Sequence, residues 1–91
     1  METLNKKQAT KLFDSNSIYI DGIDVIPEKT AIDILGAEPC KYAKLFEPMP
    51  ELYYKKHTTP QLETFYSFNF AGFMTAVTHY NADLILKGDS E

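Results

Sequence analysis

The sequence predicts an α+β fold: a small antiparallel sheet, made of an N-terminal hairpin and two later strands, with a C-terminal helix packed on one face and short helices at the edges. Three observations predict it. Asp21-Gly22 separates two β-rich runs, a later aromatic cluster alternates with a period of two, and the apolar spacing becomes helical after Gly72. The 91 residues suit a single domain (1–91), and 44% hydrophobic with 24% charged residues is typical of a folded protein.

The first expected element is a short helix over residues 4–13. Thr3 can cap its start, and Asp14-Ser15-Asn16 ends it. Its few apolar side chains lean to one side and form only a thin edge. We therefore expect this helix to lie as a lid at the margin of the fold.

A β-hairpin is expected next, with strands over residues 17–20 and 23–26. Both runs are rich in isoleucine, and Asp21-Gly22 between them tolerates the positive φ angles of a type I′ turn. Pro27 ends the second strand because its nitrogen has no hydrogen to donate. This hairpin supplies the first two strands of the predicted sheet.

Two short helices are expected between the hairpin and the later strands. Residues 28–35 begin with an acid and stop before Gly36, which favours a helix, with a third strand as the alternative. Residues 39–47 open with a proline and are stopped by Pro48-Met49-Pro50. Beyond these prolines, residues 51–57 alternate as a half-buried strand does.

The aromatic cluster lies within residues 65–73, and its spacing must be judged as either an α-helix or a β-strand. Wound as a helix, it would leave Phe68 in water on the face opposite the other rings. Extended as a strand, it places Tyr66, Phe68 and Phe70 on one face. The strand leaves less aromatic surface in water, so it is the better prediction.

The last expected element is the most strongly patterned helix of the chain. Apolar residues recur at helical spacing from Phe73 onward, and the helix is expected to close near residues 87–88. Residues 89–91 would form a frayed tail. The threonines of this segment and Val77 leave an all-β fold as the alternative.

In the assembled fold, one sheet face would pack against the final helix and the other would face solvent. The residues expected inside are Leu52, Tyr54, Tyr66, Phe68 and Phe70, against Phe73, Val77, Tyr80 and Leu84. The residues expected on the outer face are Tyr53, Lys55, His57, Phe65, Ser67 and Asn69.

Residues that carry catalytic or metal chemistry are few and scattered. Cys40 is the only cysteine, and neither His57 nor His79 stands at a spacing typical of a nucleophile and its base. The same three residues lack the paired ligands of a zinc site, and the acids near Asp21 lack the spacing of a calcium loop. We therefore expect a protein that is not an enzyme, without catalytic residues, metal or cofactor.

Nine lysines, no arginine and thirteen acids give a net charge of -4. Arginine provides the planar fork that recognises phosphate and guanine, and the negative charge repels nucleic acid, so a nucleic-acid partner is not expected. No apolar run reaches the roughly 18 residues that span a bilayer, and the N-terminal residues lack a signal-peptide pattern. We expect a cytoplasmic protein without membrane contact.

The function that these exclusions leave is binding. Several tyrosines and Phe65 exceed what a small core needs, and tyrosine supplies a large contact area at low entropic cost. We expect a non-enzymatic module that contacts a protein partner or a second copy of itself. The residues expected to make this contact are Tyr53, Lys55, His57 and Phe65 of the outer face and the acids Asp21, Asp24, Glu28 and Asp33.

Composition also indicates a biological setting. Lysine without arginine, together with abundant isoleucine, asparagine, tyrosine and phenylalanine, is typical of AT-rich coding, which fits a phage or mobile-element protein that inhibits a host enzyme. The acids would then imitate phosphates in a basic groove of that enzyme. The alternative is small-molecule binding or catalysis in a pocket between subunits of a homo-oligomer, lined by tyrosines and histidines.

Overall fold

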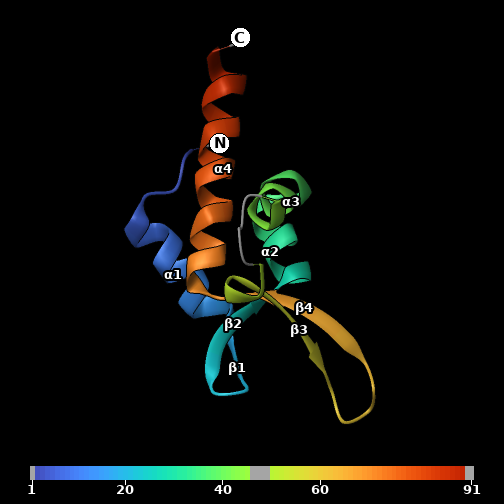
Figure 1. Ribbon diagram of the computed structural model, residues 1–91. Helices are drawn as coiled ribbons and strands as arrows, with labels where there is room; N and C mark the ends of the chain where they lie inside the picture. Colours follow the sequence, from blue (N-terminus) through green and yellow to red (C-terminus); the bar gives the residue numbers. More distant parts are fainter. Residues whose placement is uncertain (1, 46–49, 90–91) are drawn as a thin grey trace.

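The structure is a computed structural model that describes residues 2–45 and 50–89. Within these residues the chain forms four α-helices, one short 3-10 helix and a four-stranded antiparallel sheet (Figure 1). In chain order the elements are α1 (Lys6–Asn16), β1 (Ile18–Ile20), β2 (Ile23–Pro27), α2 (Glu28–Leu35), α3 (Ala37–Leu45), η1 (Pro50–Leu52), β3 (Tyr54–Thr58), β4 (Thr64–Phe68) and α4 (Phe70–Asp89). The predicted α+β fold, with the C-terminal helix packed on the sheet, is confirmed.

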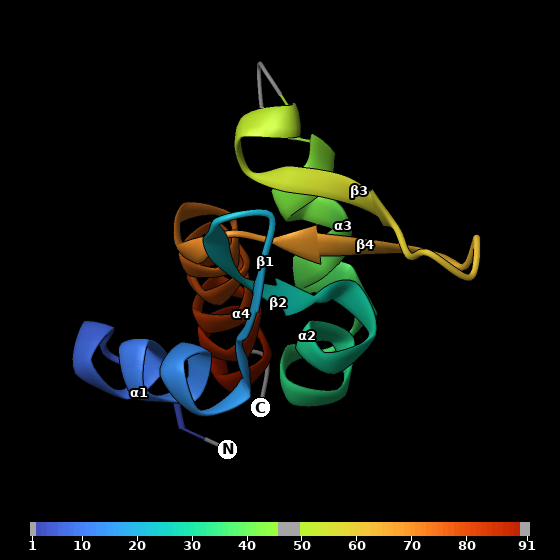
Figure 2. The same ribbon diagram turned by 90° about the horizontal axis from the view of Figure 1, so that it is seen from below.

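The sheet has the strand order β1-β2-β4-β3, and each neighbouring pair is antiparallel. The predicted hairpin is present as β1 and β2, and its turn residues Asp21 and Gly22 have φ angles of 53° and 84°, both positive as in a type I′ turn. β2 joins the second hairpin where Ile26 pairs with Phe68. Figure 2 shows β4 running between β2 and β3, so β3 is an edge strand.

Helix α1 begins and ends later than predicted. Its N-cap is Asn5 and not Thr3, because the Asn5 side chain accepts a hydrogen bond from the Gln8 backbone N–H while the Gln8 side chain accepts one from the Asn5 N–H. Just before the cap, the Asn81 side chain of α4 bonds both the backbone N–H and the carbonyl of Leu4, each at 2.7 Å. These two bonds fix the start of α1 to α4.

The two helices predicted between the hairpins are α2 and α3. α2 has the predicted bounds Glu28–Leu35, so the alternative of a third strand there is wrong. Gly36 follows with a φ of 96°, a conformation that suits glycine. α3 begins at Ala37, earlier than predicted, with Pro39 in its first turn, where the missing N–H loses no helical hydrogen bond. The predicted end of this helix at residue 47 lies outside the described residues.

The aromatic cluster is divided between a strand and a helix. β4 ends at Phe68, and Asn69 caps α4, since its side-chain Oδ1 accepts from the Gly72 backbone N–H at 2.9 Å. Phe70 is therefore the first residue of the helix, and its predicted place on the sheet is wrong. The all-β alternative is wrong as well. Gly72 lies against the Tyr53 carbonyl and the Phe68 ring, where an added Cβ would collide with backbone.

The third strand also starts later than predicted. Residues Pro50–Leu52 form η1, so the extended chain begins at Tyr54 and runs to Thr58. The 3-10 turn points Leu52 away from the core, and its side chain is 54% exposed although it was expected inside.

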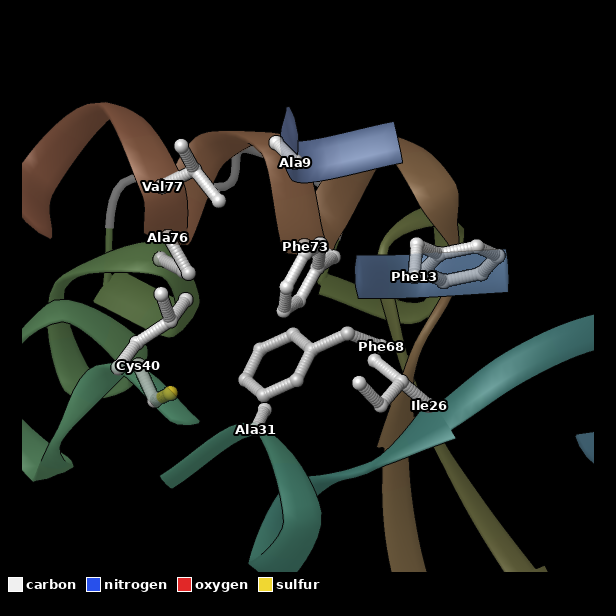
Figure 3. Packing of buried hydrophobic residues seen from close by; sticks show 11 residues of the cluster. Ala9, Phe13, Ile26, Ala31, Cys40, Phe68, Phe73, Ala76 and Val77 are labelled. Atoms are coloured by element: carbon white, nitrogen blue, oxygen red, sulfur yellow. The ribbon is translucent and has the colours of Figure 1, made fainter. Parts of the chain in front are cut away.

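The core lies where α4 meets the end of the sheet. Figure 3 shows Phe68 of β4 and Phe73 of α4 pointing toward each other at its centre, and their exposed fractions are 1% and 0%. The other buried members of the cluster are Ala9, Phe13, Ile26, Ala31, Leu35, Cys40, Ala43, Ala76 and Val77. The predicted burial of Phe68, Phe73 and Val77 is confirmed, while Tyr54, Phe70 and Tyr80 are partly buried at its margin.

Tyr66 is the main exception to the predicted inner face, because its side chain is 43% exposed. It lies two residues before Phe68 on β4 and therefore on the same face. Only the Phe68 end of β4 adjoins α4, whereas the rest of the β3–β4 hairpin extends away from this helix (Figure 1). The aromatic face beyond Phe68 is thus left outside the cover of α4.

Candidate functional site

The outer face of the β3–β4 pair is less open than the sequence predicts. Lys55 pairs with Ser67 and His57 pairs with Phe65, so these four residues share one face, as predicted. His57, however, is 2% exposed and Ser67 is 0% exposed. The predicted exposure of His57 and Ser67 is therefore wrong.

The turn of the β1–β2 hairpin contacts this face and completes a polar chain formed by Asp21, His57 and Ser67, of which His57 and Ser67 are buried. His57 Nδ1 lies 3.1 Å from Asp21 Oδ2, and His57 Nε2 lies 2.7 Å from Ser67 Oγ. An ionised carboxylate only accepts hydrogen bonds, so Nδ1 carries a hydrogen, and in the neutral ring Nε2 accepts from the Ser67 hydroxyl. The Phe65 ring stacks on the imidazole at a centroid distance of 5.0 Å.

The polar chain has the order of groups found in Ser-His-Asp triads, but its surroundings favour a structural role. A nucleophile must reach a substrate carbonyl, and the Ser67 side chain is fully enclosed. Both ring nitrogens of His57 are bonded, so the chain anchors the hairpin turn to the sheet without an unsatisfied buried group. Ser67 was missing from the predicted site residues, and its place on the same face as His57 is the signal that could have found it.

An open groove of about 570 Å³ lies between α2 and the β3–β4 hairpin, and we call it the tyrosine groove. Its lining residues are Glu28, Lys29, Ile32, Asp33, Lys44, Tyr54, Phe65 and Tyr66. Glu28, Asp33 and Phe65 are among the predicted contact residues, and the fold brings these three together. The two tyrosines, the two lysines and Ile32 are additions that only the structure supplies.

Two parallel tyrosine rings form the floor of the tyrosine groove. Tyr54 and Tyr66 stack with centroids 5.2 Å apart and planes 6° apart. The Tyr54 hydroxyl donates a hydrogen bond to Glu28 Oε2, while Lys44 Nζ lies 3.3 Å from Glu28 Oε1 and 5.0 Å from the Tyr54 ring centroid. Glu28 is therefore held by two internal partners, and Tyr66 remains as the exposed end of the stack.

Cys40 lies behind the tyrosine groove, on the core side of α3. Burial above all, together with the nearby Glu28 carboxylate, raises the pKa of its thiol to about 11 against the opposing effect of Lys44. The side chain is 1% exposed. Cys40 is consequently a protonated, enclosed thiol and an unsuitable nucleophile.

The remaining predicted contact residues lie on other elements. Asp24 is exposed in β2 and pairs across the hairpin with Tyr19. Lys55 is exposed on the edge strand β3. Tyr53 is half-buried, and its carbonyl accepts from the Asn69 backbone N–H at 3.1 Å. None of these three residues lines the tyrosine groove, so the eight predicted residues do not form one patch around it.

A second, smaller pocket of about 250 Å³ lies between α3 and α4. Its lining residues are Glu38, Pro39, Tyr42, His79, Ala82, Asp83 and Leu86. The Tyr42 and His79 rings contact each other across it at a centroid distance of 5.5 Å. This pocket combines a tyrosine and a histidine, the residue types expected for a small-molecule site.

Among the residues that the structure describes, no group of three or more His, Cys, Asp or Glu side chains is placed to hold a metal ion. No described helix combines the length and apolar character that a membrane span needs.

No protein-family model, curated protein or solved structure matches this chain. The proposals below therefore rest on the geometry of the molecule itself.

Proposed function

We propose that this protein is a non-enzymatic module that binds a protein partner through the tyrosine groove. One observation carries the proposal: Tyr66 stacks flat on Tyr54 and is 43% exposed, so a large aromatic surface stays in water beside an open groove. The stack is supported by the hydrogen bond from the Tyr54 hydroxyl to Glu28 and by the Lys44–Glu28 pair, which position the Tyr54 ring under Tyr66. A preformed aromatic surface of this kind is typical of binding hot spots.

The lining of the groove also suits a protein surface better than a small buried ligand. Phe65 and Ile32 add apolar area to the rings, while Asp33 and Lys29 provide a polar rim. An apolar centre with a polar margin is the usual anatomy of a protein interface.

The narrower proposal is that the partner is a host enzyme that this protein inhibits in the cytoplasm, as a phage or mobile-element accessory protein would. The acids differ in how they could contribute to such binding. Asp21 is bonded to His57 and Glu28 to Lys44 and Tyr54, whereas Asp24 and Asp33 are exposed. Imitation of phosphates would therefore depend mainly on Asp24 and Asp33, and their replacement by asparagine should weaken a salt-sensitive association.

The protein-binding proposal can be tested by site-specific photo-crosslinking in the cell of origin. Replacing Tyr66 with p-benzoylphenylalanine should crosslink one dominant protein, identified by mass spectrometry. The same replacement at Tyr19, which is 74% exposed on the other hairpin, should not yield that product.

The purified partner then provides the quantitative test. Tyr66→Ala should lower its affinity at least tenfold by calorimetry, and Tyr19→Ala should leave it unchanged. Absence of a crosslinked protein at position 66, or equal losses for the two alanine variants, would contradict binding through the groove. A crosslinked second copy of the chain would make the groove a self-association surface.

The second candidate function is small-molecule binding or catalysis between subunits of a homo-oligomer, and the α3–α4 pocket favours it. Tyr42 and His79 meet there over a volume of about 250 Å³. A thermal-shift screen against nucleotides and metabolites should raise the melting temperature by several degrees for a true ligand. Such a rise, lost in His79→Ala and found together with a dimer in native mass spectrometry, would support this function over the first.

A further inference from the structure

The tyrosine groove already holds one cation of the protein itself. Lys44 Nζ sits between the Glu28 carboxylate, at 3.3 Å, and the face of the Tyr54 ring, at 5.0 Å from its centroid. The two charged side chains are 34% and 24% exposed, so the pair is partly shielded from water. A carboxylate and an aromatic face together thus provide a cation site within this groove.

The same two components occur a second time in the groove without a cation. One face of Tyr66 is covered by Tyr54, and no other ring contact or cation–π contact of Tyr66 occurs within the described residues. The exposed Lys56 is its cross-strand neighbour on the same sheet face, without a cation–π contact to the ring. Asp33 lines the same groove, is exposed, and has no hydrogen bond or ion pair with any residue in the described part of the chain. Tyr66 and Asp33 therefore present an open aromatic face and a free carboxylate to one space.

We infer that this second position takes the guanidinium group of an arginine on the partner protein, an inference that rests on the protein-binding function proposed above. A guanidinium is planar, so it can stack on the Tyr66 ring while its fork of N–H groups pairs with the Asp33 carboxylate. An ammonium can make only a point contact with each. The chemistry of the two groups therefore favours arginine over lysine.

Charge and composition identify the source of this arginine. The protein carries a net charge of -4, which favours the approach of a basic segment. Its nine basic residues are all lysine, so a second copy of the chain has no arginine to offer. The occupant is consequently a different protein with an exposed arginine.

Two lysines in the groove act against a further cation, and they differ in effect. Lys44 is committed to Glu28 and the Tyr54 ring. Lys29 is exposed and makes no ion pair within the described residues, so its charge directly opposes an incoming guanidinium. Removing the Lys29 charge should therefore strengthen arginine binding, which gives the test a variant with the opposite sign.

The test is an NMR titration of the isotope-labelled protein with N-acetyl-arginine methylamide. Amide shifts should concentrate at the lining residues of the tyrosine groove and give a dissociation constant in the millimolar range. N-acetyl-lysine methylamide should bind at least about threefold more weakly, because it cannot stack. N-acetyl-citrulline methylamide, which keeps the shape and lacks the charge, should bind more weakly still.

Four variants locate the site. Asp33→Asn and Tyr66→Leu should each weaken arginine binding about three- to tenfold. Lys29→Gln should strengthen it about twofold, and Asp14→Asn, at an exposed acid of α1 outside the groove, should leave it unchanged. The amide spectrum of each variant shows whether it is folded, and Asp33→Asn remains informative if Tyr66→Leu is not.

Equal responses to arginine and citrulline, or equal losses in Asp33→Asn and Asp14→Asn, would overturn the inference. A crosslink from position 66 to a protein partner, combined with no arginine response, would overturn the arginine site and leave the proposed function standing. A crosslink only to a second copy of the chain would overturn it too, since that copy contains no arginine.

Discussion

The polar chain and the tyrosine groove both include residues of β3 and β4, and there polar side chains are buried while an aromatic side chain is exposed. His57 and Ser67 are polar and enclosed, whereas Tyr66, their aromatic neighbour on β4, is 43% exposed. The difference arises from what packs over each part of the ladder. The β1–β2 hairpin turn reaches His57 through Asp21, while α4 ends its cover at Phe68. Burial here follows the placement of neighbouring elements more than the polarity of the residue.

The largest expected effect comes from removing the centre of the polar chain. His57→Ala leaves a cavity and deprives the buried Ser67 hydroxyl of its partner, so the free energy of unfolding should fall by about 2–4 kcal/mol. Urea denaturation measures it. Ser67→Ala, which removes only one bond of the chain, serves as control and should lower the free energy by less. A loss below about 0.5 kcal/mol for His57→Ala would mean that the hairpin is held by other contacts.

The next effect concerns Cys40, behind the tyrosine groove. Its pKa of about 11, against an ordinary value of 9.0, lowers the thiolate fraction about 100-fold at pH 8, so a disulfide reagent should label the folded protein at least that much more slowly than the unfolded chain. If the reagent labelled the folded protein as fast as the unfolded chain, α3 would have to move often enough to expose Cys40 to solvent.

The same shift gives stability a pH dependence. The pKa of this acid is raised in the folded state, so the unfolded chain loses its proton first as the pH rises above 9.0, and the folded protein keeps its proton until about 11. The contribution of Cys40 to stability is therefore full below pH 9 and declines between pH 9 and pH 11. The difference between wild type and Cys40→Ala across this range isolates it, and parallel curves would contradict the shift.

Removing the Tyr66 side chain, which is larger than His57 but more exposed, should lower the free energy of unfolding less than removing His57 does. Tyr66→Ala loses the stack on Tyr54 and the buried part of a residue that is 43% exposed, so we expect a loss of about 1 kcal/mol in the free energy of unfolding. Thermal and urea unfolding measure it beside His57→Ala. A loss equal to or greater than that of His57→Ala would show that the tyrosine floor belongs to the core and is not reserved for binding.

The smallest expected effect lies at the open end of the polar chain. The Asp21 side chain is 60% exposed, so water screens its pairing with His57, and Asp21→Asn should cost about 0.5 kcal/mol. A double-mutant cycle with His57→Ala measures the coupling directly. A coupling above about 2 kcal/mol would make Asp21 a full member of the buried chain.

Local signals in the sequence were enough for several elements. Asp21-Gly22 predicted the hairpin turn, and the acid at Glu28 with Gly36 after Leu35 predicted α2 to the residue. Such features are set by neighbours in the chain, through backbone φ angles and helix ends. The α+β class was predicted because apolar residues alternate with a period of two in the aromatic cluster and recur at helical spacing after Gly72.

The position of that change was harder to predict. The alternation of aromatic residues continues through Phe70, so it hides the cap at Asn69, where a side-chain oxygen accepts from the Gly72 backbone N–H and starts α4. Asparagine is a common cap, but nothing in the pattern of rings distinguishes a residue after the cap from the next residue of a strand.

The candidate site depended on contacts between distant segments. Alternation correctly placed His57, Phe65 and Ser67 on one face, yet it could not show that a hairpin turn carrying Asp21 would cover two of them. Likewise, Glu28, Asp33 and Phe65 were chosen separately, and only the packing of α2 beside the second hairpin joins them in one groove.

The place of β3 at the margin of the sheet has a consequence for how the protein behaves at high concentration. An edge strand offers unpaired backbone groups to any strand of another molecule and can seed fibrils. Lys55 and Lys56 are both exposed on this strand, so adjacent copies that tried to pair along it would bring like charges together. We therefore expect Lys55, selected from the sequence as a contact residue, to oppose aggregation along this edge.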